Sequence, residues 1–474
     1  MRIGIDCRMF EASFTGIGRY TFELVENLQR LSREDYKASA TTTASIAKTS
    51  ASVGAQTTAK TPGSSPSDNS RTSAHPQVSA QIHEYVLFFN DPEYSNYEPK
   101  EPNFKKVLVN ARHYSIKEQT TFLKAINAEN LDIMHFTHFN APILYRKPFV
   151  VTIHDLTHTL FPGRKMTSLP YRLAYKAVVK NAVKKSKRII AISQNTKNDL
   201  IKMLNADPAK IDVVYEGVNS EFHQFTPDEK SIAAKALADK YGISEPFLLY
   251  TGVHRYHKNL PRLVEAFAKI AANANAAQSH TQPTQQATRQ VEPPHANAQA
   301  QPPLSLVITG KSDPLYQEAE NLTKSLNLED RIFFTGLIPE QDIVALYNLA
   351  KIYVFPSLYE GFGLPVLEAM ACGTPVCASN VSSIPEIAGK SQATNATTTA
   401  AETQTSANAL LFDPYDVDDI ALKITTLLED ADLRKTLIQR GLSRIRDFSW
   451  EKMSKEILAV YTSAQVRNSA TPNS

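Results

Sequence analysis

The chain has 474 residues, carries 51 Lys and Arg residues against 48 Asp and Glu residues, and is 42% hydrophobic. At about 150 residues a domain, this length gives room for two or three domains with separate cores. The formal net charge of +3 lacks the clustered basic excess with which proteins hold a nucleic-acid backbone, so we expect no nucleic-acid partner.

Cysteine usage and the N-terminus bear on the compartment. The three cysteines, Cys7, Cys372 and Cys377, are too few for a disulfide framework, and none stands in a zinc-binding spacing. The first apolar stretch is interrupted by Asp6 and Arg8 and is too short for a signal peptide. No stretch approaches the roughly 20 apolar residues of a membrane span. We therefore expect a cytoplasmic protein.

Short apolar runs alternate with longer helical patterns along the chain. The predicted strands are Arg2–Ile5, Glu84–Phe89, Lys105–Val109, Ile133–Phe136, Phe149–Ile153, Arg188–Ile192, Ile211–Val214, Phe247–Tyr250, Leu304–Thr309, Ile332–Thr335, Ile352–Phe355 and Pro375–Ala378. The clearest helical patterns are Gly18–Arg30, Pro170–Lys187, Leu260–Ala272, Asp416–Asp430 and Ser449–Ser463. Continuous Val, Ile and Leu runs are typical of parallel strands buried on both faces, and the regular alternation predicts doubly wound α/β sheets.

Three stretches, at about 37–81, 272–303 and 391–408, differ in composition from the rest of the chain. They are rich in Ala, Thr, Ser, Gln, Asn and Pro, with almost no large apolar side chains. Such segments cannot bury enough surface to offset their ordering entropy, so we interpret them as low-complexity loop insertions. Residues 465–474 have the same character and predict a disordered tail.

The distribution of strands predicts the domains. About seven predicted strands precede Gly242 and about five follow it. We therefore predict a Rossmann-like domain over 1–235 and a second over 236–448. A C-terminal helix over 449–464 can pack back on the N-terminal domain.

The segment that carries the most chemistry follows the eleventh predicted strand. Glu360 precedes a glycine-containing loop, and Glu368 lies eight residues later in the expected helix. The backbone N–H groups of Phe362, Gly363 and Leu364 at this helix start can bind an anion such as a phosphate. The two carboxylates can accept hydrogen bonds from sugar or ribose hydroxyls. Alternatively, they only stabilise the helix by interacting with the positive end of its dipole.

This segment, Glu360-Gly-Phe-Gly-Leu-Pro-Val-Leu-Glu368-Ala, resembles the signature of retaining nucleotide-sugar glycosyltransferases of family 4. Other stretches resemble landmarks of that family in the same order. They are Thr15-Gly-Ile-Gly18-Arg-Tyr, Thr152-Ile-His154-Asp155, Ala191-Ile-Ser-Gln-Asn, Val214-Tyr-Glu-Gly217-Val-Asn219 and Tyr250-Thr-Gly252-Val-His-Arg255-Tyr-His-Lys258-Asn. The resemblance covers nearly all of the chain outside the insertions, and it implies the GT-B fold, in which two Rossmann-like domains face a cleft.

The resemblance also implies roles for the residues of the second half. Arg255 and Lys258 would neutralise the departing phosphate, which agrees with the need for fixed cations beside a leaving nucleoside diphosphate. Glu360 would bind the sugar hydroxyls and Glu368 the ribose, while the backbone of Phe362–Leu364 would contact the sugar and the phosphates.

Two further motifs lie in the first half. Gly16 and Gly18 would let the backbone approach the phosphates or sugar, whereas a dinucleotide fingerprint would need a third glycine at Thr21 or its neighbour. His154 and Asp155 follow an apolar strand, where ligand-facing residues gather, and the family histidine contacts the donor sugar or the acceptor. The predicted catalytic residues are His154, Arg255, Lys258 and Glu360. The predicted donor-binding residues are Gly16, Gly18, Phe362, Gly363, Leu364 and Glu368, and the predicted acceptor-binding residue is Asp155.

The pair Asp416-Val-Asp418 matches the metal-binding Asp-x-Asp of another glycosyltransferase fold. Here it precedes a helical pattern and is better interpreted as an N-terminal cap. We therefore predict no essential metal, and no cofactor beyond the sugar nucleotide that serves as co-substrate.

A basic row recurs every four residues along the predicted helix Pro170–Lys187. It consists of Arg172, Lys176, Lys180 and Lys184. We expect this row to lie opposite Leu173, Ala177 and Val178. It is either an ordinary solvated helix face or a site of peripheral contact with anionic lipid at the inner face of the plasma membrane.

Together these features predict a retaining glycosyltransferase that moves a hexose from a nucleoside diphosphate to a hydroxyl of a glycan or glycolipid. The Gly-Ile-Gly-Arg-Tyr and His-Asp-Leu-Thr variants resemble bacterial mannosyltransferases of surface-polysaccharide and lipopolysaccharide synthesis, so GDP-mannose is the expected donor. The alternatives are a UDP-sugar-dependent glucosyl- or N-acetylglucosaminyltransferase, a sugar-nucleotide epimerase of similar fold, which the Glu360 loop disfavours, and a non-catalytic sugar-nucleotide-binding subunit.

Overall fold

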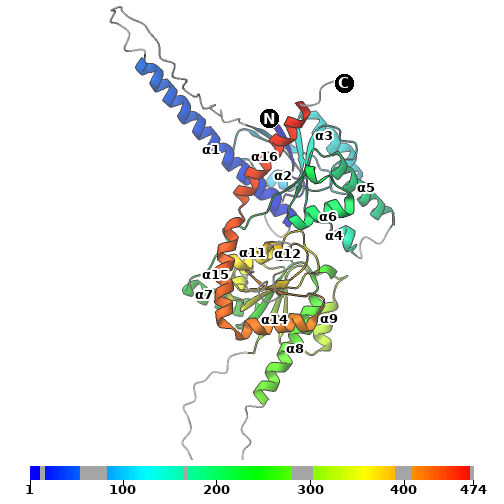
Figure 1. The fold of residues 1–474 in the computed structure, drawn as a ribbon, viewed down its shortest axis with the longest axis vertical. Helices are drawn as coiled ribbons and strands as arrows, with labels where there is room; N and C mark the ends of the chain where they lie inside the picture. The colour runs from blue at the N-terminus through cyan, green and yellow to red at the C-terminus, as the bar shows by residue number, and fades with distance from the viewer. Residues whose placement is uncertain (11–15, 54–82, 164–168, 280–302, 390–407, 470–474) are drawn as a thin grey trace, which may run out of the picture. The chain divides into compact units, whose positions relative to one another are not determined.

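The computed structural model describes residues 1–10, 16–53, 83–163, 169–279, 303–389 and 408–469. It contains two sheets of parallel strands with helices packed around them (Figure 1). The predicted class, doubly wound α/β sheets, is therefore confirmed. Most of the predicted insertions and half of the predicted C-terminal tail lie outside the described residues.

The first sheet has seven strands in the order β3-β2-β1-β4-β5-β6-β7. They are β1 (Arg2–Asp6), β2 (Glu84–Phe89), β3 (Phe104–Leu108), β4 (Ile133–Phe136), β5 (Phe149–Ile153), β6 (Arg188–Ala191) and β7 (Ile211–Val213). In register, Ile3 of β1 stands opposite Tyr85 of β2 and Ile133 of β4. Every residue of β4 and β5 is buried, as the continuous apolar runs predict for parallel strands covered on both faces.

The second sheet has six strands in the order β10-β9-β8-β11-β12-β13. They are β8 (Phe247–Thr251), β9 (Ser305–Thr309), β10 (Ile332–Gly336), β11 (Ile352–Phe355), β12 (Val376–Ser379) and β13 (Leu410–Phe412). The edge strand β13 was not predicted, because its three residues form too short an apolar run beside a low-complexity stretch. After β8 the next strands, β9 and β10, are added on one side of it. After β11 the next strands, β12 and β13, are added on the opposite side, so the strand order reverses between β8 and β11.

The described α-helices surround both sheets. They are α1 (Gly16–Val53), α2 (Glu93–Asn96), α3 (Leu123–Ala128), α4 (Thr157–Leu160), α5 (Leu169–Lys185), α6 (Gln194–Leu204), α7 (Pro227–Tyr241), α8 (Leu260–Ser279), α9 (Glu318–Ser325), α10 (Glu340–Leu349), α11 (Leu364–Ala371), α12 (Ile384–Ile387), α14 (Val417–Glu429), α15 (Ala431–Arg444) and α16 (Trp450–Ser469). Asp416 caps α14, accepting hydrogen bonds from the backbone N–H groups of Asp418 at 2.8 Å and Asp419 at 3.2 Å. The predicted capping role of Asp416 is confirmed.

Three helices run further than predicted. Helix α1, the long blue helix in Figure 1, continues to Val53 and so enters the first predicted insertion. Helices α8 and α16 likewise extend to Ser279 and Ser469. The interpretation of these first residues as loop or tail was wrong. Adding a residue to an existing helix costs much less than nucleating one, and alanine, frequent in the extensions of α1 and α8, has the highest helix propensity.

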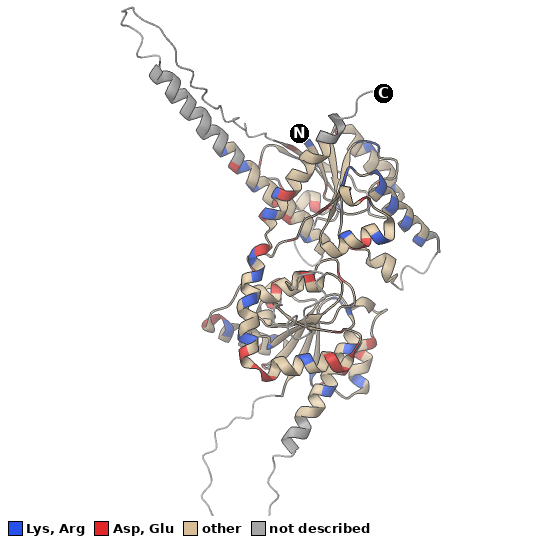
Figure 2. Cartoon of the chain, in the orientation of Figure 1, with Lys and Arg blue, Asp and Glu red and all other residues tan. Residues whose placement is uncertain are grey.

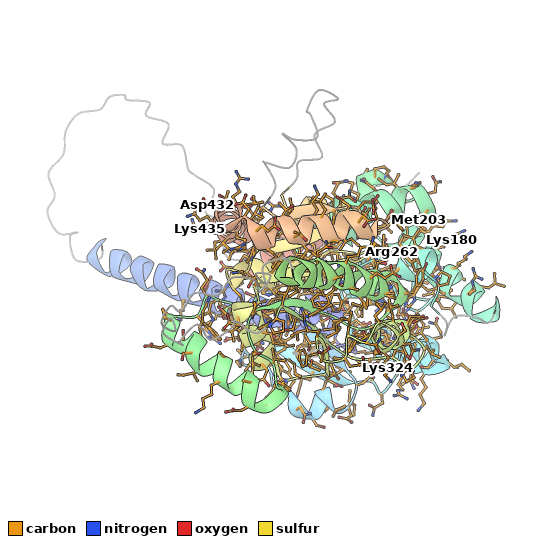
Figure 3. The ribbon with its side chains drawn as sticks, turned by 90° about the horizontal axis from the view of Figure 1, so that it is seen from below. Lys180, Met203, Arg262, Lys324, Asp432 and Lys435 are labelled. Atoms are coloured by element: carbon orange, nitrogen blue, oxygen red, sulfur yellow. The ribbon has the colours of Figure 1, made fainter. Side chains whose placement is uncertain are left out.

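The basic row on α5 is exposed, but its predicted orientation was wrong. Arg172, Lys176, Lys180 and Lys184 are all exposed, and basic residues recur along α5 in Figure 2; Figure 3 labels Lys180. Leu173 is 58% exposed. It lies beside the basic row, because successive side chains of a helix are rotated by only about 100° around its axis. The buried face consists instead of Tyr175, Val179, Ala182 and Val183. Both interpretations of the row stay open.

Two compact units can be distinguished, residues 1–150 with 461–474 and residues 151–460. Within the first unit, His135 Nδ1 lies 2.7 Å from the hydroxyl of Tyr461, in the second half of α16. The predicted domain boundary between residues 235 and 236 stays a prediction. Among the helices of the described ranges, none combines the length and apolar composition needed to cross a bilayer.

Candidate active site

Glycines occupy the carboxyl ends of three neighbouring strands of the second sheet. Gly252 follows β8, Gly310 follows β9 and Gly336 ends β10. Gly310 has a φ of +134°, and a Cβ built on it would lie 2.1 Å from the carbonyl oxygen of Gly252. Because no side chain fits at Gly310, the backbone is bare at this point of the edge, where open α/β sheets bind their ligands.

Arg255 and Lys258 follow β8 at this edge, as predicted. The Arg255 guanidinium pairs with Asp313, which follows β9. Lys258 Nζ lies 2.6 Å from Glu360 Oε1, and these two side chains are only 17% and 14% exposed. The side-chain amide of Asn259 donates to backbone carbonyls at residues 356 and 414, which anchors the turn that presents Lys258. The structure therefore brings two predicted residues, Lys258 and Glu360, together between β8 and β11.

The glycine-containing loop after β11 ends at Gly363, and α11 begins at Leu364, as predicted. The first backbone N–H groups of a helix have no acceptor within it, so those at this helix start can serve an anionic ligand. The backbone of Glu360 is held by Ser382, whose hydroxyl lies 3.0 Å from Glu360 N and donates to Glu360 O at 2.6 Å. The loop is thus fixed at the residue before its first glycine.

Glu368 lies on α11 and is only 8% exposed. Its Oε2 accepts a hydrogen bond of 3.0 Å from the hydroxyl of Tyr347 on α10. The Tyr347 hydroxyl is also 2.7 Å from Thr251 Oγ1 at the end of β8. Glu368 therefore faces the interior beside the glycine-lined edge, and its predicted contact with a ribose stays a prediction.

His154 and Asp155 follow β5, and the loop after β11 packs directly on them. A Cβ built on Gly361 would lie 2.0 Å from the carbonyl oxygen of His154 and 3.0 Å from the Asp155 Cβ. Ser193 Oγ donates to the Gly361 carbonyl at 2.6 Å, and Thr196 Oγ1 donates to it at 3.2 Å. The absence of a side chain at Gly361 is what allows His154 and the loop to meet.

The His154 ring faces a buried carboxylate. Its Nδ1 lies 3.4 Å from Glu216 Oε1, and both side chains are buried. Asp155 accepts a hydrogen bond from the backbone N–H of Thr157 at 2.7 Å and so stabilises the start of α4. The predicted contacts of His154 and Asp155 with donor or acceptor stay predictions.

The segment that carries Glu216 is held by the only tryptophan of the chain. Trp450 Nε1 donates to Asn219 Oδ1 at 2.6 Å. A Cβ on Gly217 would lie 2.3 Å from the backbone nitrogen of Trp450. The start of α16 thus packs tightly against the segment beside His154.

Gly16 and Gly18 lie in the first turn of α1, in the other compact unit. A Cβ added to Gly16 would meet nothing within 4 Å. The residues before Gly16 lie outside the described ranges, so the predicted glycine loop is described only from its helical side. The roles of both glycines in donor binding stay predictions.

Three residues at the site were not predicted from the sequence. Asp313 follows β9 and Glu216 follows β7, so the rule that polar residues gather after parallel strands could have identified both. Tyr347 lies inside α10, where it is one of several buried side chains and no sequence pattern distinguishes it. Within the described residues, no group of three or more His, Cys, Asp or Glu side chains is arranged to hold a metal ion.

The stability of the protein is expected to be sensitive to acid because of His257, which lies in the sequence between the predicted phosphate-binding residues Arg255 and Lys258. Its burial and the nearby Lys258 charge lower its pKa to about 4. An unfolded histidine titrates near pH 6.5, so between about pH 6.5 and pH 4 the unfolded chain binds one more proton, and stability falls as the pH falls. We expect His257→Gln to flatten the decline of the melting temperature between pH 6.5 and pH 4.5.

The control for this change is His223→Gln, which alters an exposed histidine. It should keep the wild-type profile. Burial also lowers the pKa of His113 to about 4, so part of the acid sensitivity should remain in His257→Gln. Parallel profiles for His257→Gln and the wild type would show that His257 does not contribute.

Comparison with known proteins agrees with this arrangement. Residues 235–444 match the family model of glycosyl transferases group 1, and residues 77–222 match that of glycosyltransferase family 4. The O-antigen chain mannosyltransferase B of Escherichia coli is 27% identical over 335 residues, covering 69% of this chain and 74% of that protein. The serotype-specific mannosyltransferase WbdA of Escherichia coli is 28% identical over 302 residues, covering 64% of this chain but only 32% of WbdA.

Solved structures show the same fold. The sucrose-phosphate synthase from Thermosynechococcus elongatus matches with a TM-score of 0.64 at 19% identity, covering 98% of each chain. HepE from Anabaena, in complex with UDP-glucose, matches with a TM-score of 0.62 at 16% identity, covering 98% of this chain and all of HepE. The chain is therefore a glycosyltransferase of the GT-B fold, in which a family 4 domain precedes a group 1 domain.

Proposed function

We propose that the protein transfers mannose from GDP-mannose, with retention of configuration, to a hydroxyl of a glycan or lipid-linked glycan. The observation that carries this proposal is the contact between Lys258 and Glu360 where the strand order reverses between β8 and β11. A cation and a carboxylate placed side by side suit the two ends of a glycosyl phosphate. The names of the curated relatives, both mannosyltransferases, support mannose as the sugar.

The proposed roles follow from the chemistry of each group. Arg255 and Lys258 neutralise the diphosphate as it departs, which favours the transition state over the bound donor. The backbone N–H groups at the start of α11 bind phosphate oxygens, and Glu360 accepts hydrogen bonds from sugar hydroxyls. Glu368 holds the ribose.

In the proposed step, the bond between the anomeric carbon and the phosphate oxygen breaks. A bond to the acceptor oxygen forms on the same face of the sugar, and the acceptor proton goes to the leaving phosphate. The products are GDP and the new glycoside. His154 contacts the donor sugar or the acceptor, and the proposal includes no metal.

A ligand screen tests the proposal. We expect GDP-mannose and GDP to raise the melting temperature of the purified protein in the presence of EDTA, and GDP-mannose to be hydrolysed slowly without acceptor. Stabilisation by UDP-glucose or UDP-N-acetylglucosamine instead would show that the donor is a UDP-sugar and not GDP-mannose. If none of these compounds binds, the proposed donor site is wrong.

A further inference from the structure

Three buried hydroxyls form a chain that ends on Glu368. The hydroxyl of Tyr353 on β11 lies 3.1 Å from Thr251 Oγ1. Thr251 Oγ1 lies 2.7 Å from the hydroxyl of Tyr347, which is 3.0 Å from Glu368 Oε2. Both tyrosines are fully buried. The chain thus connects strands β8 and β11 with helices α10 and α11.

The carboxylate fixes the direction of these hydrogen bonds. The Tyr347 hydroxyl donates its single proton to Glu368 Oε2. Thr251 must then donate to Tyr347, and Tyr353 to Thr251. Burial and the neighbouring Glu368 raise the pKa of Tyr347 well above its ordinary value, so its proton stays in place at any working pH. Hydrogen bonds that run in one direction strengthen one another.

We propose that Tyr347 is a positioning residue that orients the Glu368 carboxylate toward the ribose of the nucleotide. This inference rests on the proposed role of Glu368. A glutamate side chain has three rotatable bonds, and holding one oxygen fixes the direction of the other. Thr251, the last residue of β8, directly precedes Gly252. The row of hydrogen-bonded hydroxyls therefore also connects the Glu368 carboxylate to the glycine-lined edge.

Two tyrosine variants provide a matched test. Tyr347→Phe and Tyr353→Phe each remove one fully buried hydroxyl that contacts Thr251, but only Tyr347 contacts Glu368. Calorimetry would measure the affinity for GDP or UDP, whichever binds the wild type more tightly, and for its 2′,3′-dideoxy form. The ratio of the two affinities reports on ribose recognition alone, because a general loosening of the fold weakens both ligands equally.

We expect Tyr347→Phe to bind the ribose form about 10-fold more weakly and to lose most of the preference over the dideoxy form, since a hydrogen bond to a charged group is among the stronger ones. Tyr353→Phe should keep the preference within about 2-fold of the wild type. If Tyr347→Phe fails to fold, Thr251→Val, which removes the donor to Tyr347 without touching Glu368, should show a smaller loss in the same direction.

Glu368→Ala separates the two ways in which the inference can fail. A loss of ribose preference in Glu368→Ala but not in Tyr347→Phe or Thr251→Val would overturn the positioning role and leave the role of Glu368 intact. An unchanged preference in Glu368→Ala would overturn ribose recognition by Glu368, and the inference about Tyr347 with it. Equal losses in Tyr347→Phe and Tyr353→Phe would also contradict a specific contact.

Discussion

Replacing Lys258 with alanine is expected to lower turnover by about 10²-fold or more, the loss typical of removing a preorganised charge contact to a transition state. The effect should be large here because Lys258 is mostly buried and already faces the site in contact with Glu360. Its removal also leaves the Glu360 carboxylate without its cation, next to a dianionic leaving group. Steady-state transfer or donor hydrolysis measures the loss.

The control is Lys269→Ala, which also removes a lysine from an ion pair. Lys269 lies on α8, pairs with Asp418 and is 48% exposed, so its loss should leave turnover unchanged. Turnover of Lys258→Ala within about 3-fold of the wild type would refute the proposed phosphate contact.

Gly361→Ala is expected to cost both stability and activity. The new methyl group would lie 2.0 Å from the carbonyl oxygen of His154, and the backbone there cannot yield as the end of a flexible side chain can. Overpacking of a tight site costs about 1–3 kcal/mol or more, so the melting temperature should fall by about 2 °C or more. Differential scanning calorimetry provides the measurement.

Gly16→Ala is the matched stability control, because a Cβ at Gly16 meets nothing within 4 Å. In the first turn of α1, alanine should leave the melting temperature unchanged or raise it slightly. A wild-type melting temperature for Gly361→Ala would mean that the loop does not pack on His154 as described.

The sequence predicted the strands well because each is a short, continuous apolar run. Ile133–Phe136, Phe149–Ile153 and Ile352–Phe355 have the predicted bounds, since parallel strands covered on both faces are mostly apolar along their whole length. The edge strand β13 was missed because it is covered less and is too short to stand out.

Side-chain direction was harder to predict than element type. The orientation of α5 was wrong because Leu173 and Ala177 are apolar but exposed, and composition alone cannot distinguish the buried side of a helix that has apolar residues on both sides. The Glu360 loop was predicted because its glycines and the proline at the start of the next helix stand close together in the sequence and form a recognisable local pattern. The contacts that orient the site, Tyr347 with Glu368 and Glu216 with His154, join residues far apart in the chain or on different helices, and no local periodicity encodes them.

The packing of Trp450 makes its intrinsic fluorescence a probe of the candidate site. The indole is buried, donates to Asn219 and sits against Gly217, one residue from the carboxylate that faces His154. Because the chain has a single tryptophan, its emission is a signal from one place rather than an average over many. Any ligand that disturbs the segment beside His154 changes the surroundings of that one fluorophore, so donor and acceptor titrations can be followed without a label.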